Sequence, residues 1–176
     1  MLPISIQYYH SPIGELIIGD YMGKLCLCDW RYRKMRDSID KRIKEGLEAD
    51  YIEQETDLIK STVIQLDEYF RKERQSFDLP LELVGSSFQK SVWNALLTIP
   101  FGKTETYLGL SRLLGNEKAI RAVASANGAN AISIIIPCHR IIGSNGELTG
   151  YAGGLSAKKK LLELENALPT NQLQLF

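Results

Sequence analysis

Two short helical segments joined by a glycine-containing turn constrain this 176-residue chain most strongly. The first covers residues 106–114 and the second residues 117–126, with Gly115 between them. Glycine readily adopts the left-handed conformation that ends a helix, and Asn116 is suited to cap the next one. Two short helices around such a turn are typical of a helix-turn-helix, although an ordinary helical hairpin has the same pattern.

The second of these helices is rich in alanine and serine, which leaves two interpretations open. A helix that reads bases in the major groove normally carries long polar side chains. A helix with small residues can instead bring its backbone close to a narrow groove, with Arg121 projecting as a probe. The same small residues also permit tight packing inside the protein, and the helix alone does not decide between the two.

The first half of the chain has a different character. Residues 1–30 predict an antiparallel meander, because β-forming runs alternate with turns at residues 11–14 and at Gly23. A charged stretch with one polar helix follows, and residues 56–72 place apolar side chains at helical spacing. Residues 75–85 are expected to form a strand or a linker that closes this unit.

These patterns predict an α+β fold. An additional helix, with Ser87 as its expected N-cap, precedes the helical pair and stops before Pro100. We expect an N-terminal α/β structural domain over residues 1–83, with an antiparallel sheet and a helix. A mostly helical domain over residues 84–169 and a C-terminal tail over residues 170–176 complete the predicted organisation.

Composition and charge exclude several classes of protein. The apolar fraction of 44% and charged fraction of 24% are ordinary for a globular protein, and no apolar run approaches the roughly 20 residues of a membrane span. Three cysteines form no disulfide framework, which favours the reducing cytoplasm. Residues 1–83 carry 12 Lys/Arg against 16 Asp/Glu, whereas residues 84–168 carry 9 against 5. The weakly basic second half is the one suited to face phosphates.

The candidate reactive centre follows the apolar run at residues 132–136, which predicts a buried strand or extended segment. This run leads to Pro137-Cys138-His139-Arg140. A thiol reacts as the thiolate, and neighbouring cationic or hydrogen-bonding groups favour that form. A lone buried cysteine is more often a small core residue. One that stands beside one of only two histidines in the chain is a candidate nucleophile.

This segment resembles the active-site signature of the O6-alkylguanine-DNA alkyltransferases, also called methylated-DNA–protein-cysteine methyltransferases. The resemblance extends over about residues 86–165 in ordered spacing, whereas residues 1–83 agree only loosely. It implies a ribonuclease-H-like N-terminal domain and a winged helix-turn-helix domain that binds DNA and transfers the alkyl group. The matching segments are Ser87-Phe88-Gln89, Val92-Trp93, Ile99-Pro100-Phe101-Gly102, Thr106-Tyr107, Arg121-Ala122-Val123, Pro137 to Gly143, Gly150 to Leu155, Lys158 and Leu161-Leu162.

The resemblance implies DNA repair by stoichiometric transfer of an alkyl group from O6 of guanine, and less readily from O4 of thymine. Cys138 would be the nucleophile and permanent acceptor, so that each molecule acts once. His139 would draw off the thiol proton through a bound water, and Glu165 would orient the imidazole. Tyr107 would donate a hydrogen bond to the guanine, and Asn130 would brace the active-site turn.

The resemblance also implies how the damaged base is reached. O6 of guanine is inaccessible inside a duplex, so the nucleotide must be flipped out, and Arg121 would replace it in the stack. The helix of small residues would lie in the minor groove, which is only about 6 Å wide. The remaining implied DNA contacts are Thr106, Tyr107, Ala122, Ser125 and Ala126, and the implied walls of the base pocket are Pro137, Tyr151, Ala152 and Gly153.

Two positions bear on the details. Ala131 stands where the family usually has proline, and Ala152-Gly153 is one of two variants, the other having a bulky aromatic residue. We therefore expect an open pocket that accepts alkyl groups larger than methyl. The chain is expected to act as a monomer on alkylated double-stranded DNA, without a cofactor and without a membrane.

A metal site is not expected. Cys26 and Cys28 lie two apart on a predicted strand and would point the same way, with His10 as the nearest further ligand. Three such residues fall short of the four that a structural zinc site usually has. Packing in the core is the favoured role of both cysteines.

The C-terminus carries a separate motif. Residues 172–176 resemble the pentapeptide with which bacterial proteins bind the replication sliding clamp, with Gln172, Leu173, Leu175 and Phe176 as the expected anchors. The alternative is a tail that folds back on its own domain.

Three other functions fit the sequence less well. A non-catalytic sensor of alkylated bases with the same fold would lack the acceptor, and Cys138 argues against it. A transcriptional regulator fused to this machinery would need further domains, for which the chain has no room. In a cysteine hydrolase the cysteine and histidine usually come from distant segments, whereas Cys138 and His139 are adjacent.

Overall fold

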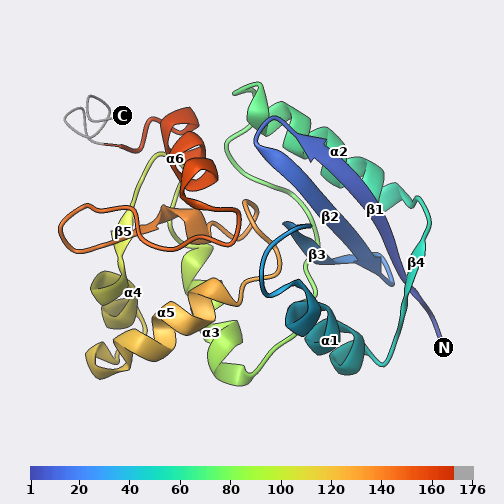
Figure 1. Cartoon of the computed structure of the whole chain (residues 1–176), viewed down its shortest axis with the longest axis horizontal. Helices are drawn as coiled ribbons and strands as arrows, with labels where there is room; N and C mark the ends of the chain where they lie inside the picture. Colours follow the sequence, from blue (N-terminus) through green and yellow to red (C-terminus); the bar gives the residue numbers. More distant parts are fainter. Residues whose placement is uncertain (169–176) are drawn as a thin grey trace.

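The computed structural model describes residues 1–168 and has two units side by side, a sheet with two helices and a mostly helical half (Figure 1). The proposed clamp-binding segment, Gln172 to Phe176, lies outside the described residues. No helix in the described part of the chain is long and apolar enough to cross a membrane.

The N-terminal sheet begins with the expected meander. Its strands are β1 (Ile4–Ser11), β2 (Gly14–Tyr21) and β3 (Lys24–Trp30), joined antiparallel through two tight turns. A short fourth strand, β4 (Tyr51–Glu53), pairs with β1 in parallel, which gives the order β3-β2-β1-β4. The α+β class is confirmed, and β4 adds a parallel edge that the sequence did not indicate.

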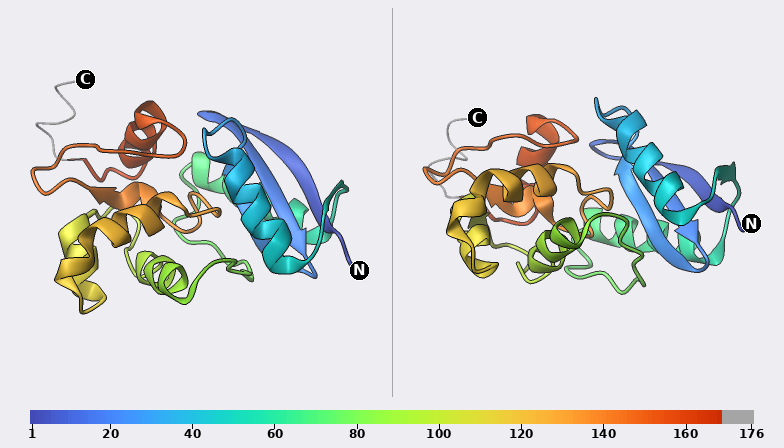
Figure 2. Two further views of the ribbon diagram at one scale, coloured as in Figure 1. Left: turned by 60° about the horizontal axis from the view of Figure 1, so that its bottom comes forward. Right: turned by 90° about the horizontal axis from the view of Figure 1, so that it is seen from below.

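Two helices cover opposite faces of this sheet (Figure 2). Helix α1 (Arg36–Leu47) buries Ile39 and Ile43 against one face, in a cluster separate from that of α2. Helix α2 (Asp57–Phe70) begins at Thr56, whose hydroxyl accepts a hydrogen bond from the amide of Ile59. The apolar side of α2 packs on the other face, in a cluster that continues into the C-terminal half and includes Cys138.

The expectation that Cys26 and Cys28 point the same way is wrong. The register between β2 and β3 shifts at Gly19 and Asp20: Gly19 pairs with Leu27, whereas Asp20 pairs with Leu25. Cys26 is thus the extra residue of a β-bulge, which reverses the alternation of side chains along β3. Cys26 packs in the α1 cluster and Cys28 in the α2 cluster.

Residues 75–85 form a linker rather than a regular strand. One bridge joins Leu81 to Leu25 at the edge of β3, where the amide of Leu25 donates to the carbonyl of Pro80 at 2.8 Å. The linker then leads to α3 (Ser87–Leu96). The N-cap is Ser86, not Ser87, because the Ser86 hydroxyl accepts from the amide of Gln89 and the Gln89 side chain accepts from the Ser86 amide.

The C-terminal half contains the expected pair of helices. Helix α4 (Tyr107–Leu113) is capped by Leu114 and followed by Gly115. The φ of +71° at Gly115 confirms the predicted left-handed C′ position. Asn116 makes no side-chain cap, because the chain enters a 3₁₀ turn, η1 (Glu117–Ala119), before α5 (Ile120–Gly128). The other elements are β5 (Glu105–Thr106), the 3₁₀ turn η2 (Cys138–Arg140), β6 (Ile141–Ile142), which pairs with β5 in parallel, and α6 (Leu155–Leu164).

Residues 132–136 are buried as expected, but they form a compact turn instead of a strand. The amide of Ile136 donates to the carbonyl of Ile132 at 3.0 Å, and that of Ile135 to Ser133 at 2.8 Å. Ile134 has a φ of +71°, which is rare for a β-branched residue. Strain of this kind costs about 1–3 kcal/mol and persists where the surroundings hold the backbone in place.

Candidate active site

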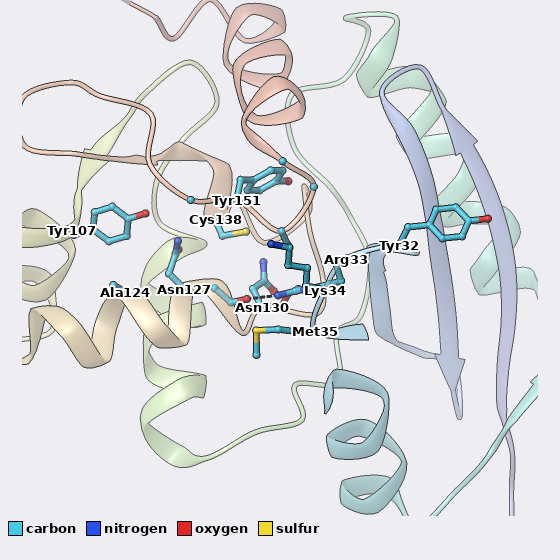
Figure 3. Close-up of a pocket in the computed structure, with 15 residues that line it drawn as sticks. Tyr32, Arg33, Lys34, Met35, Tyr107, Ala124, Asn127, Asn130, Cys138 and Tyr151 are labelled. Carbon is cyan, nitrogen blue, oxygen red and sulfur yellow. Dashed lines mark hydrogen bonds between the residues drawn. The ribbon is translucent and has the colours of Figure 1, made fainter. Parts of the chain in front are cut away.

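Cys138 lies at the base of a cavity of about 620 Å³ between the two halves of the protein (Figure 3). It is the first residue of η2, its side chain is buried, and its amide donates to the carbonyl of Ile136 at 2.8 Å. The C-terminal half contributes further walls from α4, α5 and the loop before α6, among them Tyr107, Ala124, Asn127, Tyr151 and Ala152.

Asn130 holds the strained turn that presents Cys138. Its amide nitrogen donates to the carbonyl of Ile136 at 2.9 Å, and its amide oxygen accepts from the amide of Ile132 at 2.9 Å. These two bonds join the ends of the turn from a side chain that is 1% exposed. Asn130 therefore links the two ends of the turn that precedes Cys138.

The environment of the thiol favours its protonated form at rest. Burial raises the pKa of Cys138, while a hydrogen bond from Asn130 and the charges of Lys158 and Arg33 act in the opposite direction. The raised pKa means that the resting thiol needs a base to become a thiolate.

His139, the next residue in the chain, is a candidate for that base. It is fully buried, and its Nε2 lies 2.6 Å from Oε2 of Glu165. Burial lowers the pKa of His139, and the opposing effect of Glu165 does not reverse this, so the imidazole is neutral at pH 7. Its Nδ1 is also buried and makes no hydrogen bond to any residue between 1 and 168.

Glu165, at the end of α6, accepts several hydrogen bonds. Arg140 donates from Nε to Oε1 at 2.8 Å and from Nη2 to Oε2 at 3.3 Å. Tyr69 donates its hydroxyl to Oε2 at 2.6 Å, and the amide of Gly102 lies 3.4 Å from Oε1. Although burial alone would raise it, the hydrogen bonds from His139 and Arg140 and the charge of Arg140 lower the pKa of Glu165 to about 2. The carboxylate is therefore ionised throughout the neutral range.

The loop before α6 forms the outer wall of the cavity. Tyr107 reaches it from α4, and its hydroxyl donates to the carbonyl of Thr149 at 3.2 Å. The buried ammonium of Lys158 donates to the carbonyls of Thr149 and Gly150 at 2.9 and 3.2 Å. Burial lowers the pKa of Lys158 to about 8. Lys158 and Tyr107 therefore hold the same loop, since both donate to the carbonyl of Thr149.

The N-terminal half supplies the remaining wall, which the sequence did not indicate. Residues 32–35 line the cavity, and Arg33 donates to the carbonyls of Gly128 and Asn130 at 2.6 and 3.2 Å. Trp30 packs behind Gly153, where an added Cβ would lie 2.5 Å from the indole ring. The width of the cavity therefore depends on contacts between the two halves.

The exposed face of α5 carries most of the expected DNA contacts. Arg121, Ala122 and Ser125 are exposed on one side of the helix. Ala126 is not, because it lies on the inner side, where its carbonyl accepts the indole N–H of Trp93 at 2.9 Å. The helical period places Ala126 with the core residues of α5, and its burial argues against a direct contact with DNA. Thr106 caps α4 through a bond from the amide of Gly109.

The other cysteines lie away from this site. Burial raises the pKa of Cys26 to about 12 and also raises that of Cys28. His10 is exposed and lies 3.2 Å from Glu15. Within residues 1–168, no three His, Cys, Asp or Glu side chains form a group suited to hold a metal ion.

Sequence reasoning missed five residues of this site: Trp30, Arg33, Tyr69, Arg140 and Lys158. Arg140 and Lys158 belong to segments that carried the family resemblance, so their positions were available without a role. Tyr69 lies within residues 56–72, whose apolar side chains at helical spacing indicate packing in the core and no role in a site. Trp30 and Arg33 come from the half that resembles the family least, and no local pattern distinguishes them.

The chain matches two family descriptions along nearly its whole length. Residues 4–83 match the ribonuclease-like domain of the 6-O-methylguanine DNA methyltransferases, and residues 87–167 match their DNA-binding domain. A methylated-DNA–protein-cysteine methyltransferase of Methanosarcina acetivorans is 43% identical over 160 residues, 90% of this chain and 96% of the relative. One from Mycobacterium leprae is 41% identical over 98% of this chain and 99% of its own.

Solved structures agree. The crystal structure of Mycobacterium tuberculosis OGT in complex with DNA superposes with a TM-score of 0.79 and 36% identity, covering 98% of this chain and 99% of that one. The Mycobacterium tuberculosis O6-methylguanine methyltransferase gives the same TM-score with 38% identity. The chain therefore belongs to the 6-O-methylguanine DNA methyltransferase family.

Proposed function

We propose that this protein repairs DNA by moving an alkyl group from O6 of guanine, and less readily from O4 of thymine, onto Cys138. The observation that carries the proposal is a buried thiol at the base of a cavity of about 620 Å³. The next residue in the chain is a neutral imidazole that is paired with an ionised carboxylate. Each monomer acts once, because the thioether formed has no route back to the thiol. The free cysteines fit a cytoplasmic protein.

The transfer is a displacement at the alkyl carbon. His139 takes the proton of Cys138 through a bridging water at its unpartnered Nδ1, and Glu165 stabilises the imidazolium that results. The thiolate sulfur then forms a bond to the alkyl carbon as the bond from that carbon to O6 breaks. The electron pair of the broken bond stays on guanine. The hydroxyl of Tyr107 turns from the carbonyl of Thr149 to donate a hydrogen bond to the base, which finally takes up a proton.

The two domains divide this work. Residues 84–169 bind DNA and transfer the alkyl group, and residues 1–83 act as the structural domain. The exposed face of α5 enters the minor groove, because its small side chains allow close approach, and Arg121 replaces the extruded nucleotide. Contacts to the backbone suit a protein that must find lesions in any sequence. The DNA complex of the mycobacterial relative supports DNA as the partner.

Mass spectrometry tests this proposal directly. The full chain is incubated with a duplex carrying O6-methylguanine, and the intact protein and its peptides are weighed. We expect a gain of one methyl group on the peptide with Cys138, matched by the loss of one lesion per protein. Cys26 and Cys28 are internal controls and should stay unmodified. Tight binding without a mass gain would favour a sensor of alkylated bases instead.

The cavity predicts tolerance of alkyl groups larger than methyl. Its volume of about 620 Å³ and the small residues Ala152 and Gly153 leave room beside Cys138. We expect the transfer rate from O6-benzylguanine to stay within about tenfold of the methyl rate, since a poorly fitting group would cost 10–200-fold. Single-turnover rates on both lesions in the same duplex measure this.

A matched variant ties that tolerance to the cavity wall. In Gly153→Ala the new Cβ would meet the ring of Trp30 at 2.5 Å, so the wall must shift into the cavity. The benzyl rate should fall more than the methyl rate. Gly23→Ala is a control for a lost glycine outside the cavity, and it should leave the ratio of the two rates unchanged. An equal loss for both lesions in Gly153→Ala would contradict a role in selectivity.

The C-terminal segment carries a second proposal, which rests on sequence alone. Gln172, Leu173, Leu175 and Phe176 bind the bacterial sliding clamp, with the two apolar residues and the aromatic ring in a preformed groove. Deleting residues 172–176 should abolish binding to immobilised clamp and leave alkyl transfer unchanged. Gln174→Ala is the control, because this residue is not an expected anchor. Unchanged affinity after the deletion would refute the proposal.

A further inference from the structure

Tyr69 is a buried titratable residue that the transfer steps above do not use. It comes from α2 in the N-terminal domain and is fully buried where the end of this helix approaches α6 (Figure 1). Its hydroxyl lies 2.6 Å from Oε2 of Glu165. The same oxygen lies 2.6 Å from Nε2 of His139. Tyr69 and His139 therefore share one acceptor atom.

The ring of Tyr69 is held as firmly as its hydroxyl. Phe70 and Phe77 pack against it from the N-terminal domain, with ring centroids 5.3 and 5.6 Å away. Phe101 packs edge-on at 6.2 Å from the loop whose Gly102 amide approaches Glu165. Burial and the nearby charge of Glu165 raise the pKa of Tyr69, so the phenol keeps its proton and acts as a donor.

We propose that Tyr69 is a positioning residue of alkyl transfer, whose hydroxyl fixes Oε2 of Glu165 against His139 and takes up part of the charge on that oxygen. The proposal rests on the roles given above to His139 and Glu165. A carboxylate oxygen with an additional donor holds a neighbouring imidazolium less strongly. The N-terminal domain thus adjusts how readily His139 becomes protonated, although none of its residues takes part in the bonds that change.

Few other groups influence the pKa of His139 through Glu165. Arg140 binds both oxygens of Glu165 and is unchanged by a substitution at position 69. The other titratable groups near His139 are Lys158, whose charge acts on it, Tyr151, whose ring packs against it, and Cys138, its neighbour in the chain. None of the three donates a hydrogen bond to Glu165, so the hydroxyl of Tyr69 can be removed by itself.

Tyr69→Phe is the test, and the chain has only two histidines, which makes an NMR titration of the imidazole protons simple. Without the Tyr69 hydroxyl, Oε2 of Glu165 has one donor fewer and should hold the imidazolium more strongly. The pKa of His139 should therefore rise by about half a unit or more. The acid limb of the single-turnover rate should move to higher pH by the same amount. Near pH 8, where the imidazole is neutral in both proteins, the rates should agree closely.

Tyr9→Phe is the matched control. Tyr9 is also buried and donates to a carboxylate of α2, Asp67, at 2.5 Å, so its loss costs a bond of the same kind away from the site. It should leave the pKa of His139 unchanged. Exposed His10 is the reference signal in each spectrum. A His139 titration that is unchanged in Tyr69→Phe, or shifted equally in both variants, would overturn the proposal.

Two further outcomes distinguish the effect of Tyr69 on His139 from the role of His139 in alkyl transfer. Replacing Tyr69 alone with 3-fluorotyrosine makes the hydroxyl a stronger donor without removing the ring, so the pKa of His139 should fall; a rise would count against the proposal. The protein with 3-fluorotyrosine at position 69 can also be used for the titration if Tyr69→Phe folds poorly. If the pKa of His139 moves as expected while the pH profile of transfer does not follow, Tyr69 acts on His139 as proposed, and His139 is not the base.

Discussion

Cys138→Ala is expected to abolish alkyl transfer while leaving binding to alkylated DNA intact. The sulfur is the atom to which the alkyl carbon bonds, and no other described residue in the cavity carries a thiol. Removing the nucleophile of a catalytic group of residues typically costs on the order of 10⁴-fold or more. The loss of lesions from a duplex with O6-methylguanine, followed in a single turnover, measures the effect.

Cys26→Ala and Cys28→Ala are the controls for a lost thiol. Both residues are buried in the sheet, on opposite faces because of the bulge, and neither lines the cavity. Each variant should transfer the alkyl group at the rate of the unmodified chain. Stoichiometric repair by Cys138→Ala, with the methyl group on another residue, would show that the acceptor has been assigned wrongly.

The parts of the site that could be predicted are those that depend on local sequence. Gly115 ends a helix because of its own backbone freedom, and Cys138 and His139 are adjacent in the chain. The helical pair and the reactive dipeptide were therefore visible, and the family resemblance supplied the role of Glu165. For residues 132–136, the apolar run predicts burial but does not distinguish a strand from a turn, because both can bury such a run.

The parts that could not be predicted depend on contacts between distant segments. Tyr69 meets Glu165 across 96 positions, and Arg33 meets Gly128 across 95. Neither pairing leaves a trace in the spacing of residues near it. The bulge at Cys26 has the same origin, since the register of β3 is set by its partner strand and its two cores. Residues of the N-terminal domain therefore entered the site without any signal in their own segment.

Glu165→Gln is expected to lower the transfer rate by about 10³-fold or more, as loss of the carboxylate does in hydrolase triads. The amide cannot stabilise the imidazolium of His139, and it presents an N–H where Tyr69 and Arg140 require acceptors. The variant should also lose about 3–5 kcal/mol of unfolding free energy, because the buried guanidinium of Arg140 is left without its partner. Rates are measured below the unfolding transition, which circular dichroism locates.

The stability change should depend on pH in a defined direction. The pKa of Glu165 is lowered to about 2 in the folded protein, from 4.5 when unperturbed, so its stabilising effect is complete above pH 4.5. That effect is lost as the pH falls from 4.5 toward 2. It amounts to roughly 3 kcal/mol for a shift of this size. Stability of Glu165→Gln should therefore change less with acid than that of the unmodified chain over this window.

Glu163→Gln on the same helix separates the buried carboxylate from a general effect of lost charge. Glu163 is partly exposed and lies 3.5 Å from Lys159, so its loss should change stability by less than about 1 kcal/mol and leave transfer intact. Glu165→Asp keeps the charge but withdraws it from His139 by one methylene. It should therefore recover part of the stability and little of the rate. If Glu165→Asp and Glu165→Gln both transferred at the unmodified rate, the carboxylate would be a structural partner of Arg140, and the stabilised imidazolium would play no part in the reaction.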